Sequence, residues 1–255
     1  MNIKIGTSGY SFDDWIGTFY PDDIKKGKML DFYVKYFPTV EINSTYYRIP
    51  HAAVMANIEK KSPVDFEFMV KTPSTLTHKR KEIEAAAKEF GECLKPMHEC
   101  GKLKGLLAQF PYSFKFSAPN LDYIKRCRDL LKEYPLYVEF RHNSWVNRTM
   151  YDQFKASDIG YVSVDEPQLP GLLKPELFNT TDTAYIRLHG RNASQWWEGG
   201  ALRYDYDYSS EELEEWKNRV KQLENKAKKV YLFFNNCHLG QAVKNAREMA
   251  ELLKV

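Results

Sequence analysis

Ionisable side chains end several short apolar segments of this chain. Glu41 lies near the end of TVEIN, Glu139 and Arg141 end LYVEFR, and Arg187 and His189 end YIRLH. A carboxyl partly shielded from water has a raised pKa, as a general acid or base near neutral pH requires, and a histidine can pass protons. We therefore interpret Glu41, Glu139 and His189 as candidates for proton transfer.

Basic side chains in similar positions suggest an anionic ligand. Arginine forks bind phosphate or carboxylate through two parallel hydrogen bonds. The alternative is that each arginine only neutralises a neighbouring carboxylate. On the first interpretation, the candidates for substrate binding are Asn43, Lys71, His78, Gln109, Arg141, Trp145, Asp165, Arg187, Arg191, Asn235 and Asn236.

A divalent metal is a less favoured interpretation of the same region. Glu41, Glu139, Asp165 and His189 could supply the mixed carboxylate and imidazole ligands found in hydrolytic enzymes. Nearby arginine and lysine oppose a cation, and the chain has no H-x-H or H-E-x-x-H spacing. We therefore expect no metal and no other cofactor.

Eight short runs rich in β-branched and aromatic residues are the predicted strands that position these side chains. They begin at Ile3, Thr39, Phe66, Gly105, Leu136, Tyr161, Ala184 and Val230. Helix-period segments lie between most of them, and the clearest are Lys28–Phe37, Lys79–Cys93, Leu121–Lys132, Ser210–Lys229 and Gln241–Leu253.

This alternation of strands and helices predicts an α/β fold with a parallel sheet closed into one (β/α)8 barrel of TIM type over residues 1–255. The alternative is an open doubly wound sheet. That fold usually has a glycine-rich phosphate turn after its first strand, and GTSGYS is a poor match to G-x-G-x-x-G. A single barrel domain is the simpler prediction.

Alternation along each strand predicts which side chains face the barrel lumen. The outward set is buried under helices and must be apolar, so the charged set faces inward. This assigns to the lumen Glu41, Asn43, Glu67, Lys71, Gln109, Glu139, Arg141, Ser163, Asp165, Arg187 and His189. Most of them end their strands, at the face where barrel enzymes build active sites. An internal network of ion pairs is the alternative, and we expect it for Glu67.

Composition excludes some other classes of protein. The chain has 37 basic and 34 acidic residues, a balance that does not by itself indicate a nucleic-acid-binding surface. The four cysteines form no C-x-x-C pair, so we interpret them as reduced thiols. No secretory signal and no apolar stretch of about 18–20 residues is present, which predicts a cytoplasmic protein.

Aromatic residues and one long connection are predicted at the same end of the barrel. The aromatic residues are Tyr10, Phe12, Trp15, Tyr46, Tyr47, Trp145, Trp196 and Trp197, which could stack on a sugar or a base or could simply pack in loops. The span Arg191–Tyr208 is longer than ordinary connections, and we interpret it as a lid.

Seven blocks in order resemble one known family. They are GTSGY, VEINSTYYRIP, KTPSTLTH, LLAQFPYSF, VEFRHNSW, YIRLHGR and FFNNCHLGQAVKNA. Together they are similar to the YecE-like family of barrel proteins, catalogued as domain of unknown function 72. The resemblance runs nearly end to end and implies a TIM-type barrel. Tyr10 stands where the family has tryptophan, a change that keeps an aromatic ring. No particular activity follows from the resemblance.

These observations predict an enzyme that uses general acid-base chemistry on a small phosphorylated or carboxylated molecule, such as a sugar phosphate or a nucleotide. Arg141, Arg187 and Lys71 would bind the anion, while hydrolase and isomerase or lyase chemistry both stay open. The alternative is a non-enzymatic module that binds nucleotide or nucleic acid through the same basic, aromatic rim. Salt-dependent binding to long RNA or DNA without turnover would favour that alternative.

Overall fold

All eight predicted strands are present and form one parallel sheet that curls into a nearly closed barrel. The computed structural model describes residues 1–255. The sheet order is β1-β8-β7-β6-β5-β4-β3-β2, and every paired neighbour runs parallel. This confirms the predicted TIM-type barrel. The strands are β1 (Asn2–Thr7), β2 (Thr39–Ile42), β3 (Glu67–Lys71), β4 (Leu103–Gln109), β5 (Leu136–Glu139), β6 (Ile159–Asp165), β7 (Thr183–Leu188) and β8 (Lys229–Phe234).

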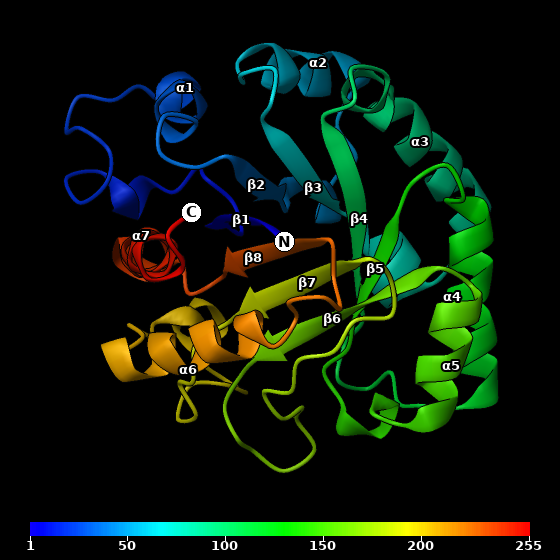
Figure 1. The fold of residues 1–255 in the computed structure, drawn as a ribbon. Coiled ribbons are helices and arrows are strands. Elements are labelled where there is room, and N and C mark those ends of the chain that lie inside the picture. Colours follow the sequence, from blue (N-terminus) through cyan, green and yellow to red (C-terminus); the bar gives the residue numbers. More distant parts are fainter.

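Seven α-helices lie outside the strands (Figure 1). They include a helix in each of the five predicted segments, together with α2 and α5. None of them combines the length and apolar character needed to cross a bilayer. The helices are α1 (Met29–Tyr33), α2 (Ala52–Lys60), α3 (Ile83–Glu99), α4 (Ala118–Leu130), α5 (Arg148–Ala156), α6 (Ser210–Lys221) and α7 (Gln241–Leu253).

Helix α6 begins as the sequence indicates but ends early. Ser209 and Glu212 form a capping box, in which each side chain accepts a hydrogen bond from the other residue's backbone N–H. The helix ends at Lys221, eight residues before the predicted Lys229, and the chain continues through turns. Asn225 has a left-handed backbone with φ of 69°, which interrupts a right-handed helix.

No helix follows β6, and this changes what covers the outer face of that strand. Residues 166–182 connect β6 to β7 as irregular chain. The Thr180 hydroxyl accepts a hydrogen bond from the Tyr161 N–H at 2.8 Å, and the Ser163 hydroxyl donates to the Phe178 carbonyl at 3.3 Å. Polar side chains can therefore face outward from β6 and still be satisfied, which a helix with an apolar face would not allow.

The barrel closes between β1 and β2 with little backbone pairing. A single parallel bridge joins Ser8 to Glu41 at this seam. A Cβ atom on Gly6 would lie 2.3 Å from the Thr39 carbonyl oxygen, so only glycine permits this approach of the two strands. Glu41, the residue predicted for proton transfer, is therefore fixed at the point where the barrel closes.

The lumen is filled in layers rather than left open. Near the amino ends of the strands, Glu67 pairs with the Lys229 ammonium at 2.6 Å and accepts from the Tyr231 hydroxyl at 2.7 Å, as the predicted internal ion pair. Above this layer, the rings of Tyr137 and Tyr185 meet edge to face with centroids 5.3 Å apart. Aromatic rings thus form a floor beneath the charged side chains at the carboxyl ends.

Candidate functional site

Arg187 is the centre of a buried cluster at the carboxyl end of the barrel. Its Nε and Nη2 atoms lie 2.9 and 2.6 Å from the two carboxylate oxygens of Glu41, and its Nη1 lies 2.6 Å from Oε2 of Glu139. The Tyr185 hydroxyl donates to Glu41 from below. All four side chains are buried. This is fork-like pairing of one guanidinium with carboxylates from β2 and β5, which rigidly joins opposite parts of the barrel.

Arg141, just beyond β5, extends this cluster towards β6. Its Nη2 lies 2.7 Å from Oε1 of Glu139, and its Nη1 donates to Oε2 of Glu166 at 3.3 Å. The other Glu166 oxygen accepts from the Leu173 N–H at 2.9 Å. The Nε of Arg141 has no hydrogen-bond partner. Arg141 therefore keeps an unused donor, whereas Arg187 has none to spare on Nε.

His189 is held as a neutral ring by its neighbours. The Nη2 of Arg187 donates to Oδ1 of Asn235 at 3.5 Å, which turns the Asn235 amide nitrogen towards Nδ1 of His189 at 2.9 Å. Nδ1 must accept, so the ring proton lies on Nε2, 3.2 Å from Oε1 of Glu139. Burial, followed by the charge of Arg141, lowers the His189 pKa to about 3. The ring thus contacts Asn235 through Nδ1 and lies beside Glu139.

The expected rise in the Glu139 pKa is wrong. Burial acts to raise it, but Arg141, Arg187 and His189 together hold the pKa of this carboxyl well below its usual range. The residue is a permanent carboxylate at neutral pH. Sequence alone could not show that two guanidinium groups contact it.

Lys71 is the cation of the site that has no carboxylate partner. Its Nζ donates to Oε1 of Gln109 at 3.0 Å and lies 4.5 Å from the centre of the Tyr46 ring. Gln109 is itself oriented, because its amide nitrogen donates to the Phe110 carbonyl at 2.7 Å. Burial, and then Arg187 and Arg141, lower the Lys71 pKa to about 8, although Glu139 and Glu41 act in the opposite direction.

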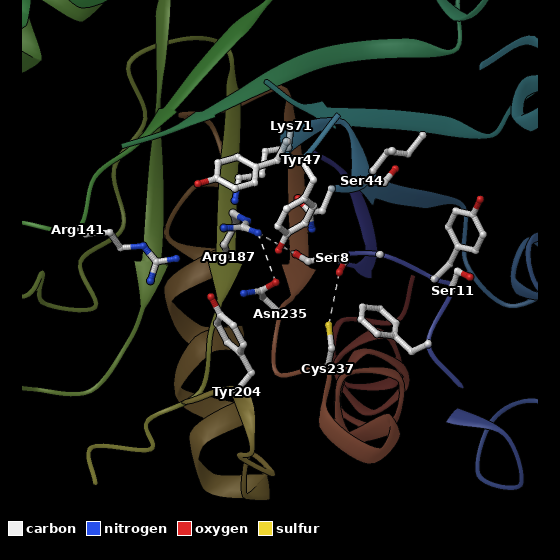
Figure 2. A pocket seen from close by; sticks show the side chains of 16 residues that line it. Ser8, Ser11, Ser44, Tyr47, Lys71, Arg141, Arg187, Tyr204, Asn235 and Cys237 are labelled. Atoms are coloured by element: carbon white, nitrogen blue, oxygen red, sulfur yellow. Dashed lines mark hydrogen bonds between the residues drawn. The ribbon is translucent and has the colours of Figure 1, made fainter. Parts of the chain in front are cut away.

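A cavity of about 430 Å³ opens above this cluster, within the size range of small-molecule sites. Figure 2 shows Lys71, Arg187, Asn235 and Tyr204 grouped around it, with Ser8 beside Arg187. Tyr204 comes from the long segment after β7, which was interpreted as a lid. The lining residues are Ser8, Gly9, Tyr10, Ser11, Phe12, Ile42, Asn43, Ser44, Tyr46, Tyr47, Lys71, Arg141, Arg187, Tyr204, Asn235 and Cys237.

The structure thus brings most of the predicted residues together at one mouth. Asn43, Lys71, Arg141, Arg187 and Asn235 line the cavity. A second group contacts the lining residues from behind, and it consists of Glu41, Glu139, His189, Gln109 and His78.

His78 is the most peripheral residue of that second group. Its ring lies edge to face with Tyr46 at 5.0 Å, and its Nδ1 lies 2.9 Å from the Thr77 hydroxyl. Burial, followed by the nearby charges of Lys71 and Arg141, lowers the His78 pKa to about 4. The ring is therefore neutral at physiological pH and supports Tyr46.

Asp165 and Arg191 correct the predicted set, because they lie on the outside of the barrel. Asp165 is the register partner of Leu188, one position from Arg187, so its side chain has the opposite direction to Arg187. The Arg191 Nε donates to both Asp165 oxygens at 3.1 and 2.9 Å, and its Nη1 donates to Glu212 of α6 at 2.9 Å. The two residues fasten α6 to the barrel.

Trp145 and Asn236 were also expected at the ligand site, and both are structural instead. Trp145 is completely buried, stacks on Phe140 with centroids 4.0 Å apart, and donates its ring N–H to the Phe114 carbonyl at 2.6 Å. Asn236 is buried and donates to the Tyr206 carbonyl at 2.8 Å. Neither residue lines the cavity.

Asp165, one of the four residues considered as metal ligands, lies on the outside of the barrel. Glu41, Glu139 and His189 gather around Arg187, while Asp165 lies on the opposite face of the barrel wall. No group of three or more His, Cys, Asp or Glu side chains is arranged to hold a metal ion.

Glu166 is the ionisable residue that the sequence reasoning missed. Burial raises its pKa to about 7, even though Arg141 opposes the rise. The sequence feature that could have revealed it is the acidic pair Asp165–Glu166, which begins at the last residue of β6. Correct alternation along β6 would have directed Asp165 outward and Glu166 towards Arg141.

Comparisons with known proteins give the family. A family model described as "Protein of unknown function DUF72" matches residues 4–255. The "UPF0759 protein YunF" of Bacillus subtilis is 34% identical over 271 residues, which cover 99% of this chain and 95% of that protein. A solved DUF72 family protein from Thermotoga maritima is 41% identical, with a TM-score of 0.93 and 100% of both chains covered. One from Enterococcus faecalis is 29% identical, with a TM-score of 0.90 and 99% and 96% covered. The chain belongs to the DUF72 family.

Proposed function

We propose that this protein is an enzyme that binds a small anionic molecule at the carboxyl-terminal mouth of its barrel and acts on it by acid-base chemistry. The observation that carries the proposal is the pair of cavity-lining cations with incomplete pairing. Lys71 forms no ion pair, and Arg141 has an unpaired buried Nε. A bound anion would give Lys71 the countercharge that it lacks and would give Arg141, which lines the same cavity, a further hydrogen-bond partner.

The balance of charge around the cavity supports an anion. Three cations, Lys71, Arg141 and Arg187, face two carboxylates that contact them closely, Glu41 and Glu139. Glu166 is the third carboxylate, and its pKa of about 7 means that it is only partly ionised at neutral pH. The cluster therefore has a small positive excess that a phosphate or carboxylate group would neutralise.

The roles within the site follow from the contacts. Glu41 and Glu139 are engaged by Arg187, so we assign them to positioning the guanidinium rather than to proton transfer. Lys71 lines the cavity, and its pKa of about 8 allows it to exchange a proton near neutral pH. Lys71 is therefore the acid-base group of the proposed mechanism, and Arg141 is the anion-binding group.

Aromatic walls set the size and nature of the rest of the substrate. Tyr10, Phe12, Tyr46, Tyr47 and Tyr204 line the cavity around its basic end. Rings of this kind cover the carbon skeleton of a sugar or a base, while hydroxyl and amide groups such as those of Ser8 and Asn43 accept or donate hydrogen bonds. A phosphorylated sugar or a nucleotide has this division of polar and apolar surface.

Calorimetric titration with sulfate and with pyruvate tests the binding half of the proposal. Wild-type protein should bind both, and Arg141→Met should weaken binding by roughly tenfold or more, since a charged hydrogen bond contributes about 1.5–3 kcal/mol. Arg191→Met is the matched control, because that arginine is equally charged but lies outside the barrel. Equal losses in the two variants would contradict the proposed site.

The enzymatic half needs a measurement of turnover. Sugar phosphates and nucleotides incubated in deuterated water should show release of phosphate or exchange of carbon-bound hydrogen, and Lys71→Met should abolish either signal. If these compounds bind but none of them shows exchange of hydrogen or release of phosphate, the protein is a binding module instead.

A further inference from the structure

Lys71 differs from two other lysines of the barrel strands and their flanks, Lys102 and Lys229. The Lys102 ammonium is 2.8 Å from Glu59, and that of Lys229 is 2.6 Å from Glu67, so each of these cations has its own carboxylate. Lys71 has the neutral Gln109 oxygen instead. A buried ammonium is normally paired, because an unpaired one is costly to remove from water. Lys71 has no such carboxylate partner, and it lies at the wall of the cavity.

The surroundings of Lys71 favour its neutral, nucleophilic form. Burial and two nearby arginines lower its pKa to about 8. At pH 7 about one in ten molecules would then have a neutral amine, roughly two orders of magnitude more than for an exposed lysine. Lysines activated in this manner, by desolvation and by neighbouring cations, form Schiff bases with carbonyl compounds.

Gln109 also positions the amine for attack. Its amide nitrogen is engaged by the Phe110 carbonyl at 2.7 Å, so its oxygen is fixed towards Lys71 at 3.0 Å. A neutral amine that donates one N–H to this oxygen keeps its lone pair available. The Tyr46 ring, with its centre 4.5 Å from Nζ, covers another side of the amine.

We propose that Lys71 is a nucleophile that forms an imine with a small carbonyl compound carrying a carboxylate or phosphate group. The proposal rests on the proposed function and deepens it, because Arg141 would bind the anionic group while Lys71 attacks the carbonyl. Both side chains line the same cavity of about 430 Å³, which accommodates a compound of this class.

The reaction balances without any further reagent. The Lys71 lone pair attacks the carbonyl carbon, a C–N bond forms, and the carbonyl π electrons move to oxygen, which takes a proton. The nitrogen of this carbinolamine then expels the hydroxyl group, which leaves as water with a second proton, and a C=N bond remains. Amine and carbonyl compound are thus converted to imine and water, with no oxidation or reduction, and water reverses the reaction.

Reductive trapping tests the proposal in the unmodified protein. Wild-type protein is incubated with pyruvate or dihydroxyacetone phosphate and cyanoborohydride at pH 7, and peptide mapping by mass spectrometry measures the adduct at each lysine. Labelling at Lys71 should exceed that at the exposed Lys228 by roughly one to two orders of magnitude, following the fraction of neutral amine. Lys71→Arg, which keeps the charge, should lose this adduct and still bind sulfate.

The outcomes separate the two proposals. Sulfate binding at the mouth, with Lys71 labelled no faster than Lys228, would overturn the imine and leave the anion site standing. Rapid labelling of Lys71 by acetone as well as by pyruvate would support the nucleophile and contradict recognition of the anion. Absence of both sulfate binding and preferential labelling would overturn both proposals.

Discussion

Two clusters of ions lie at the carboxyl ends of neighbouring strands, and only one of them meets a cavity. The inner cluster, Arg187 with Glu41 and Glu139, is in the lumen with its side chains at most 2% exposed. The outer cluster, Asp165 with Arg191 and Glu212, fastens α6, and its arginine is 23% exposed. In sequence both are charged residues at strand ends. One position along a strand decides whether such a residue can contact a ligand or can only stabilise the fold.

The largest expected difference between the clusters is in stability. Arg187→Met should lower the free energy of unfolding by roughly 3–5 kcal/mol, because two buried carboxylates lose their partner. Arg191→Met should cost less, roughly 1–3 kcal/mol, because it leaves one buried carboxylate, Asp165, without its partner rather than two. Urea denaturation of both variants measures the two losses. Similar losses would mean that the inner cluster is not the more tightly coupled one.

The inner cluster should give stability a pH dependence through the neutral ring of His189. The folded-state pKa of His189 is about 3, below the ordinary value of 6.5, so the unfolded chain binds the extra proton first. The contribution of His189 to stability should therefore fall as pH drops below 6.5, by about 2 kcal/mol at pH 5, while Glu166, with its raised pKa, acts in the opposite direction. Relative to the wild type, His189→Gln should gain about that much unfolding free energy between pH 7 and pH 5. An unchanged slope in this variant would contradict the neutral, buried ring.

Anion affinity should fall in two steps between pH 6 and pH 9. Glu166 gains its negative charge through a pKa of about 7, and Lys71 loses its positive charge through a pKa of about 8, so both steps weaken binding. Each step should be on the order of threefold to tenfold. Sulfate titrations over this range should lose the lower step in Glu166→Gln and the upper step in Lys71→Met. A flat profile in the wild type would count against both assignments.

The smallest expected effect is that of the outer cluster on the ligand. Arg191→Met should change sulfate affinity by less than about twofold, since residues that are distant and share no partners act nearly independently. The same calorimetric titration measures it. A tenfold loss would show that the outer cluster contributes to the site, and the comparison between the clusters would fail.

Most of the fold was predictable because each strand is a compact run of β-branched and aromatic residues. Alternation then predicted the inward direction of Glu41, Glu139 and Arg187 correctly. It failed in β6, where the rule assumes an apolar cover from a helix. The cover of β6 is irregular chain and α6, whose polar groups satisfy Ser163 and Asp165 on the outside.

The chemistry of the site was harder to predict than its position. The charge state of Glu139 depends on Arg141 and Arg187, and Arg187 comes from a strand 48 residues away in the sequence. The protonation of Lys71 depends on its burial and on the nearby Arg187, which no local pattern encodes. The sequence could therefore indicate where ionisable residues gather, but not which of them would lack a partner of opposite charge.

Anomalous diffraction from crystals soaked in selenate tests the central claim most directly, because selenium locates the anion without any assumption about the substrate. Selenate is expected in the cavity, within hydrogen-bonding distance of Lys71 Nζ and the Arg141 guanidinium. Selenate found only beside Arg191 or on the outer surface, with the cavity free of anion, would contradict that claim.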